Sequence, residues 1–105
     1  MLRVQHLVLD LLKQLRPVLV AIGRRDSSLE NQLRRAASSV ALNLAEGAGS
    51  LGGVKKQRYR TALGSLDEVR MALQVAVALG YLSSVDPSLS RLVDEVGRIV
   101  GSLAR

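Results

Sequence analysis

Three residue types are missing from this sequence of 105 residues: cysteine, phenylalanine and tryptophan. Without cysteine the chain has no disulfide, no thiolate ligand for zinc and no thiol nucleophile. The one histidine, His6, cannot form a multi-histidine metal site by itself. The two tyrosines are the only aromatic residues, and so little aromatic surface argues against the base-stacking platforms of proteins that read single strands.

Long uncharged apolar runs are also absent. The N-terminal apolar stretch is interrupted by Asp10, Lys13 and Arg16, so it does not have the pattern of a signal peptide. No segment offers the roughly 20 consecutive apolar residues that a membrane-spanning helix needs. We therefore expect a cytoplasmic protein without membrane association, built as a single domain over residues 1–105.

The patterns that support catalysis or cofactor binding are missing as well. The chain has no GxxxxGK phosphate-binding motif and no recognisable pair of nucleophile and base. The carboxylates of Asp67-Glu68 and Asp94-Glu95 are adjacent in sequence, so each pair points to different sides of its helix. A di-iron bundle needs Glu-x-x-His pairs, and none is present. We therefore predict a protein that is not an enzyme, with no metal site and no cofactor.

Apolar residues make up 48% of the chain, and they recur at steps of three and four residues, which predicts amphipathic helices. The first expected helix covers about residues 2–22. The second begins at a cap within residues 26–28 and ends at Gly47 and Gly49. The third covers about residues 54–79, and the fourth begins at Asp86-Pro87. Pro17 lies inside the first of these and predicts a kink. Gly52 and Gly53 are expected in the second connection.

Each expected helix has one apolar face. The residues expected to point inward are Val4, Val8, Leu11, Leu15, Val18 and Ile22; Leu29, Leu33, Ala36, Val40 and Leu44; Tyr59, Leu63, Leu66, Val69, Leu73, Ala76 and Gly80; and Leu89, Leu92, Val96, Ile99 and Leu103. Short connections force neighbouring helices to be antiparallel, so the predicted fold is an all-α, antiparallel, up-down-up-down four-helix bundle.

Polar side chains form stripes on the second and third expected helices. Their members lie three or four residues apart and are Arg35, Ser39, Asn43 and Glu46 on one helix, and Thr61, Ser65 and Glu68 on the next. Two interpretations stay open. The stripes are either solvated or satisfy one another between helices, with an Arg35–Glu68 ion pair as one example, or they form a polar binding surface.

The densest charge cluster lies in residues 54–60, at the start of the third expected helix. The helix dipole disfavours cations at that position, so local stability does not explain them. Either Glu46 and the end of the preceding helix offset the charge, or a polyanion does. A net charge of +6 favours RNA or DNA as a partner. The predicted nucleic-acid-binding residues are Arg34, Lys55, Lys56, Arg58 and Arg60.

The first expected helix has a second apolar stripe on the side opposite its main face, formed by Leu2, Leu9 and Val20. A single bundle would expose these side chains to water. An apolar stripe on an exposed face is typical of a subunit contact, so we predict a homo-oligomer with these residues in its interface.

Four short sequence blocks occur in a characteristic order: QLRRAA at 32–37, NLAEG at 43–47, ALGSL at 62–66 and LGYL at 79–82. Through them the chain resembles the small bacterial four-helix-bundle proteins of intervening sequences in 23S ribosomal RNA genes. That family includes the accessory proteins of diversity-generating retroelements. The resemblance extends over nearly the whole chain.

The resemblance implies a four-helix bundle that assembles into a barrel-shaped homopentamer. Its retroelement branch implies a basic accessory protein that associates with a reverse transcriptase and with RNA or DNA. Two functional hypotheses follow. The first is a non-enzymatic nucleic-acid-binding accessory protein, and the second is a protein-protein interaction scaffold with no nucleic-acid role.

Overall fold

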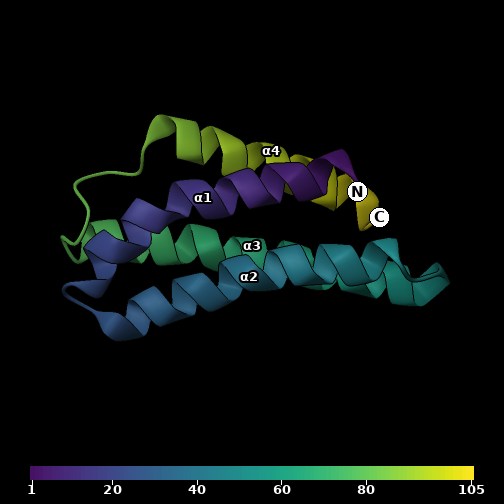
Figure 1. Ribbon diagram of the computed structural model, residues 1–105, viewed down its shortest axis with the longest axis horizontal. Helices are drawn as coiled ribbons and strands as arrows, with labels where there is room; N and C mark the ends of the chain where they lie inside the picture. The colour runs from purple at the N-terminus through teal and green to yellow at the C-terminus, as the bar shows by residue number, and fades with distance from the viewer.

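A computed structural model describes residues 1–105 and contains four helices and no strand. The helices are α1 (Arg3–Gly23), α2 (Ser27–Ala48), α3 (Gly52–Ala78) and α4 (Pro87–Leu103). Consecutive helices run in opposite directions, and both termini lie toward the end of the bundle at which α2 turns into α3 (Figure 1). The helices α1 and α3 each pack against both α2 and α4. The predicted all-α bundle is therefore confirmed.

The α2–α3 hairpin projects beyond the start of α1 and the end of α4 (Figure 1). The alignment of α3 with α4 is shown by the Arg70 side chain of α3, which lies against Gly97 of α4. A Cβ atom added at Gly97 would be 2.6 Å from the Arg70 guanidinium, so these two residues are at the same level of the bundle. Because α3 contains 18 more residues on the side of Arg70 that leads to Gly52, its first turns extend past α4.

One apolar core holds the four helices together. It contains 22 buried residues, almost all Leu, Val and Ala, with Tyr59 as its one aromatic side chain. The inward faces predicted for α1 and α2 are buried, except that Val18 is half-buried. Since burying one Leu or Val side chain contributes about 1.5–3 kcal/mol, this core is the main source of stability.

The predicted inward face of α4 is confirmed at Leu89 and Val96, which are buried, but not at its other three residues. Val93 and Val100 are fully buried, whereas Leu92, Ile99 and Leu103 are half-buried. In α4, Val93 and Val100 each directly follow another apolar residue, Leu92 and Ile99. Two adjacent apolar stripes therefore both have helical spacing. The stripe of Leu89, Val93, Val96 and Val100 faces the core between α1 and α3.

Gly49 is the C-cap of α2, as predicted, but three glycines near it have roles other than those predicted. Gly47 does not end α2, because the helix continues to Ala48 and Gly47 is buried inside its last turns. A Cβ atom at Gly47 would lie 2.7 Å from the Tyr59 ring, so the glycine lets Tyr59 pack directly on the α2 backbone. Gly52 and Gly53 are not in a loop but form the first turn of α3, which Gly52 enters with a φ of +56°.

Gly80 was predicted as part of an apolar face and instead ends α3. Its φ of +79° is in the left-handed region, which favours glycine. The Tyr81 N–H donates to the Ala76 carbonyl at 2.8 Å, and the Gly80 N–H donates to the Val77 carbonyl at 3.0 Å. This pair of hydrogen bonds is the Schellman arrangement of a helix C-terminus.

A polar cluster joins the two connections at the opposite end of the bundle. The Asp26 carboxylate caps α2 by accepting from the Leu29 N–H at 2.9 Å, and it also accepts from the Tyr81 hydroxyl at 3.0 Å. The Arg25 guanidinium lies over the Tyr81 ring, 5.2 Å from its centroid, and donates to the Gly80 carbonyl. The hydrogen bond to Asp26 raises the pKa of Tyr81. This cluster therefore fixes the α1–α2 turn against the end of α3.

The predicted cap of α4 is confirmed, since Asp86 accepts from the Ser88 N–H at 2.7 Å and Pro87 is the first helical residue. Helix α1 continues through Pro17 without a break. No helix combines the length and the apolar content needed to cross a membrane.

Candidate nucleic-acid interface

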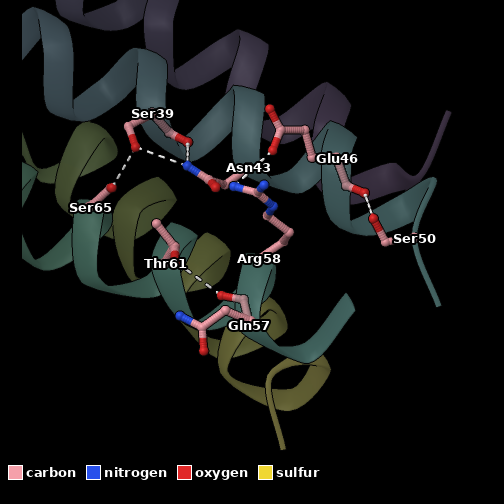
Figure 2. Close-up of polar contacts among 8 residues, drawn as sticks. All are labelled: Ser39, Asn43, Glu46, Ser50, Gln57, Arg58, Thr61 and Ser65. Atoms are coloured by element: carbon pink, nitrogen blue, oxygen red, sulfur yellow. Dashed lines mark hydrogen bonds and ion pairs between the residues drawn. The ribbon is translucent and has the colours of Figure 1, made fainter. Parts of the chain in front are cut away.

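The polar residues predicted on two helices meet in one groove between α2 and α3, which we call the α2–α3 groove (Figure 2). The Ser39 and Ser65 hydroxyls share a hydrogen bond of 2.7 Å across the helices. Asn43 donates to both the carbonyl and the hydroxyl of Ser39, at 2.9 and 3.0 Å. Ser65 is the one buried polar residue of the chain, and no buried polar side-chain atom lacks a partner. These groups therefore satisfy one another.

Charges in the α2–α3 groove are also largely balanced. Arg58 reaches from α3 to Glu46 of α2 at 3.0 Å (Figure 2). This ion pair confirms that Glu46 offsets part of the charge cluster at the start of α3. The Glu46 carbonyl accepts from the Ser50 hydroxyl at 2.7 Å, which ties the end of α2 to the turn.

The predicted Arg35–Glu68 ion pair does not form. Both side chains line one part of the groove, an open depression of about 330 Å³, but they are not within salt-bridge distance. Both residues are exposed, and two long solvated side chains gain little from a single surface ion pair. Arg35 thus remains an unpaired cation with an unpaired carboxylate beside it.

The basic residues predicted as one nucleic-acid-binding set lie on different faces. Arg34 is bound to Glu30 on its own helix at 2.7 Å. Arg58 faces α2, as its bond to Glu46 shows. Lys56 and Arg60 each lie two residues from Arg58, which is about 200° around the helix, so they are on the flank away from α2. The cluster that is continuous in sequence is therefore divided in space.

The flank of α3 that faces α4 has its own ion pairs. Arg70 binds Asp67 of its own helix at 3.1 Å and Asp94 of α4 at 3.4 Å. Asp67 follows Arg60 by seven residues, or about two turns, so Arg60 lies on this same flank. Neither Lys56 nor Arg60 has an ionic partner.

Two arginines of α4 and its C-terminal end complete this surface, and sequence reasoning missed them. Arg98 and Arg105 are exposed and have no ionic partner. Arg98 follows Asp94 by four residues, so it shares that face of α4, and Arg105 lies just beyond the end of the helix at Leu103. Their spacing of seven residues was the available signal. It was not recognised because this part of the chain has as many acidic as basic residues.

The apolar stripe predicted on α1 is exposed, as expected for a subunit taken alone. Leu2, Leu9 and Val20 have exposed fractions of 42%, 41% and 54%. Elsewhere on the surface, no group of three or more His, Cys, Asp or Glu side chains is gathered closely enough to hold a metal ion.

The sequence matches the model of the 23S rRNA-intervening sequence protein family over residues 4–102. The fold is similar to a crystal structure described as a protein with unknown function from the S23 ribosomal protein family of Bacteroides thetaiotaomicron VPI-5482. The two chains are 14% identical, and the match covers 97% of this chain and 98% of that chain with a TM-score of 0.82. This likeness concerns the fold alone. No curated protein matches the sequence.

Proposed function

This chain belongs to the 23S rRNA-intervening sequence protein family, and we propose that it is a non-enzymatic, oligomeric accessory protein that binds nucleic acid. The family has no established activity, so the proposal depends on the chemistry of the surface. A reverse transcriptase is the protein partner that the resemblance to retroelement accessory proteins suggests.

The observation that supports nucleic-acid binding is the charge of the projecting α2–α3 hairpin. Residues 44–61 contain four cations and a single carboxylate, Glu46, which is paired with Arg58. The remaining Lys55, Lys56 and Arg60 have no ionic partner near a helix N-terminus, where the dipole also disfavours positive charge. A phosphate backbone would relieve this repulsion, and the release of its counterions would drive binding.

Oligomerisation strengthens such a surface. The exposed stripe of Leu2, Leu9 and Val20 supports a contact between copies, because apolar side chains aligned on one helix face are stabilised by removal from water. A homo-oligomer, pentameric by resemblance, repeats each weak basic surface once per subunit. Several simultaneous contacts raise the avidity for a polymer such as RNA or DNA without any reading of bases.

Equilibrium binding of the purified protein to labelled hairpin RNA, single-stranded DNA and duplex DNA tests this proposal. Changing Lys55→Glu and Lys56→Glu together should weaken binding at least tenfold at about 100 mM salt. The control pair Arg24→Glu and Arg91→Glu changes the net charge equally at the opposite end of the bundle from the hairpin. Circular dichroism should show unchanged helical content for both. Failure of the unmodified protein to bind any of the three at 50 mM salt would refute the proposal.

A protein-protein interaction scaffold is the second candidate, and the exposed apolar stripe of α1 is the observation that favours it. A scaffold predicts assembly of the chain without affinity for polyanions. The same binding series therefore separates the two, since the molar mass of the assembly is expected in both cases and nucleic-acid affinity in only one.

A further inference from the structure

We infer that the nucleic-acid contact is the face shared by α3 and α4 at the end of the bundle, that it takes the backbone of a double helix, and that the α2–α3 groove is not part of it. The contact residues are Lys56, Arg60, Arg98 and Arg105, which we call the α3–α4 basic patch. This inference rests on the proposed function and names its surface and its class of ligand.

The register of the two helices places the cations of the patch in a row along one face. Arg70 of α3 contacts Asp94 of α4 and lies against Gly97, so Arg98 is at the level of Arg70. Arg60 lies ten residues from Arg70 toward the start of α3, or about 15 Å along the bundle, and Lys56 lies about one turn further out. Arg105 follows the end of α4 at Leu103 and lies between these levels, because α4 runs in the same direction along the bundle.

The charge of this face is positive because its cations outnumber its carboxylates. Two acidic residues share the face with the patch, Asp67 and Asp94, and both are bound to Arg70 rather than to a cation of the patch. Glu95 of α4 is bound to Arg3 of α1 at 2.9 Å. No carboxylate is therefore within salt-bridge distance of the patch.

In the α2–α3 groove, by contrast, cations and carboxylates lie close together. Its cations each have a carboxylate close by: Arg58 is paired with Glu46, Arg34 with Glu30, and Arg35 lines the same depression as Glu68. Its hydroxyls and its amide are bonded to one another. A phosphate entering this groove would meet carboxylates and would have to break existing hydrogen bonds, so the groove is a poor site for a polyanion.

A double helix fits the patch better than a single strand. Binding of single strands relies on aromatic side chains that stack on bases. Here Tyr59 is only 3% exposed, and the Tyr81 ring is covered by Arg25 at the other end of the bundle. Exposed arginines and lysines held on rigid helices are suited to contact phosphates. A double helix presents phosphates in fixed rows, so the cations need no rearrangement of the ligand.

Two charge-matched double variants test the location. Arg60→Glu with Arg98→Glu removes half of the patch, whereas Arg34→Glu with Arg35→Glu makes the same change of charge on α2. All four side chains are exposed, so both proteins should retain the helical content and the molar mass of the unmodified protein. The probes are a 20-base-pair duplex RNA, a 20-base-pair duplex DNA and the corresponding single strands.

The patch variant should lose at least tenfold in affinity for the duplexes at about 100 mM salt, and the slope of log K against log salt should become shallower by about two. The α2 variant should stay within about threefold of the unmodified protein. Equal losses in the two variants, or a larger loss in the α2 variant, would overturn the location while leaving nucleic-acid binding intact.

The single-strand probes test the class of ligand. Tighter binding of a duplex than of a single strand with the same number of phosphates supports the double-helical backbone, and the two duplexes show whether RNA or DNA is preferred. Equal or tighter binding of the single strands would overturn this part of the inference. Absence of binding to every probe by the unmodified protein would instead refute the proposed function itself.

Discussion

At Gly47, a missing side chain decides how closely α2 and α3 approach. The Tyr59 ring occupies the space that a Cβ atom would take, at 2.7 Å, so Gly47→Ala forces the two helices apart or the ring out of the core. Overpacking of this kind costs about 1–3 kcal/mol, which exceeds the roughly 0.5–1 kcal/mol that alanine gains over glycine inside a helix. We expect the free energy of unfolding in urea to fall.

The control for this prediction is Gly101→Ala in α4. Gly101 is also helical, but no atom lies within 4 Å of the position of its added Cβ. That variant should therefore be unchanged or more stable by about 0.5–1 kcal/mol. If both variants shifted the urea midpoint in the same direction and by the same amount, the close packing of Tyr59 on Gly47 would not explain the glycine.

The hydrogen bond between Ser39 and Ser65 should make the two residues energetically coupled. Ser65→Ala leaves the half-buried Ser39 hydroxyl with Asn43 as its one partner and should lower the free energy of unfolding by about 1 kcal/mol. The double variant with Ser39→Ala should cost less than the sum of the single changes. Urea unfolding of all four proteins measures this coupling, and strict additivity would show that the bond contributes nothing.

At the residue scale, the sequence predicted which side chains are polar and where they lie, but not their partners. The stripes containing Ser39 and Ser65 were expected, and pairing of Glu46 with the cations of α3 was one of two alternatives. The prediction of an Arg35–Glu68 ion pair was wrong. Whether two such side chains meet depends on a few ångströms of interhelical register, which the spacing of residues along one helix does not contain.

At the scale of the element, the cap of α4 should make stability depend on acid pH. The Ser88 backbone N–H, the Ser88 side chain and then weaker interactions lower the pKa of Asp86 below its ordinary value of 3.8. A carboxyl group with a lowered folded pKa contributes stability above its unfolded pKa and loses it as pH falls through the folded pKa. The contribution of Asp86 should therefore be complete at pH 5–7 and decline below pH 3.8.

Comparison with Asp86→Asn isolates this contribution, because asparagine caps a helix without a charge. The unmodified protein should be the more stable at pH 7, and the difference between the two proteins should shrink as pH falls below 4. Urea midpoints at pH 7, 5 and 3 measure it. A difference that stays constant across this range would show that the charge of Asp86 has no part in the cap.

The existence, type and order of all four helices were predictable, because long runs of apolar residues at helical spacing leave little choice. The end of α2 at Gly49 was predictable too, but the roles of three other glycines were not. Gly47, Gly52 and Gly80 are alike in sequence terms, yet one is packed under a ring, one starts a helix and one ends a helix. The role of each glycine depends on what the neighbouring helix places against it and on its backbone angle φ. The order of residues along the chain specifies neither.

At the scale of the whole molecule, the apolar stripe of α1 should control assembly. Leu9→Glu or Val20→Glu places a charge in the predicted subunit contact, and removing a carboxylate from water there is strongly unfavourable. We expect each variant to have a lower molar mass by light scattering than the unmodified protein, with the same helical content.

Met71→Glu is the matched control for assembly. Met71 is 64% exposed, which is more than Leu9 or Val20, but it lies on α3, outside the stripe. Its molar mass should not change. If Leu9→Glu and Val20→Glu both kept the molar mass of the unmodified protein, the stripe would not be an interface. The exposed apolar residues of α1 would then need another explanation.

The location of the nucleic-acid contact is the part least accessible from sequence. The cluster from Lys55 to Arg60 was found because it is continuous along the chain. Arg98 and Arg105 join part of it only because antiparallel packing places the second half of α4 alongside α3, on the flank from which Arg60 also projects. The same packing separates Arg58 from its neighbours in sequence and pairs it with Glu46.

The salt dependence of binding to a 20-base-pair duplex tests the central claim most directly. Four phosphate contacts per subunit predict that log K falls against log salt with a slope of about −3.6 or steeper, which is a loss of roughly 100-fold between 50 and 200 mM salt. Binding that is absent at 50 mM, or that is nearly independent of salt, would contradict the claim that this basic surface binds phosphates.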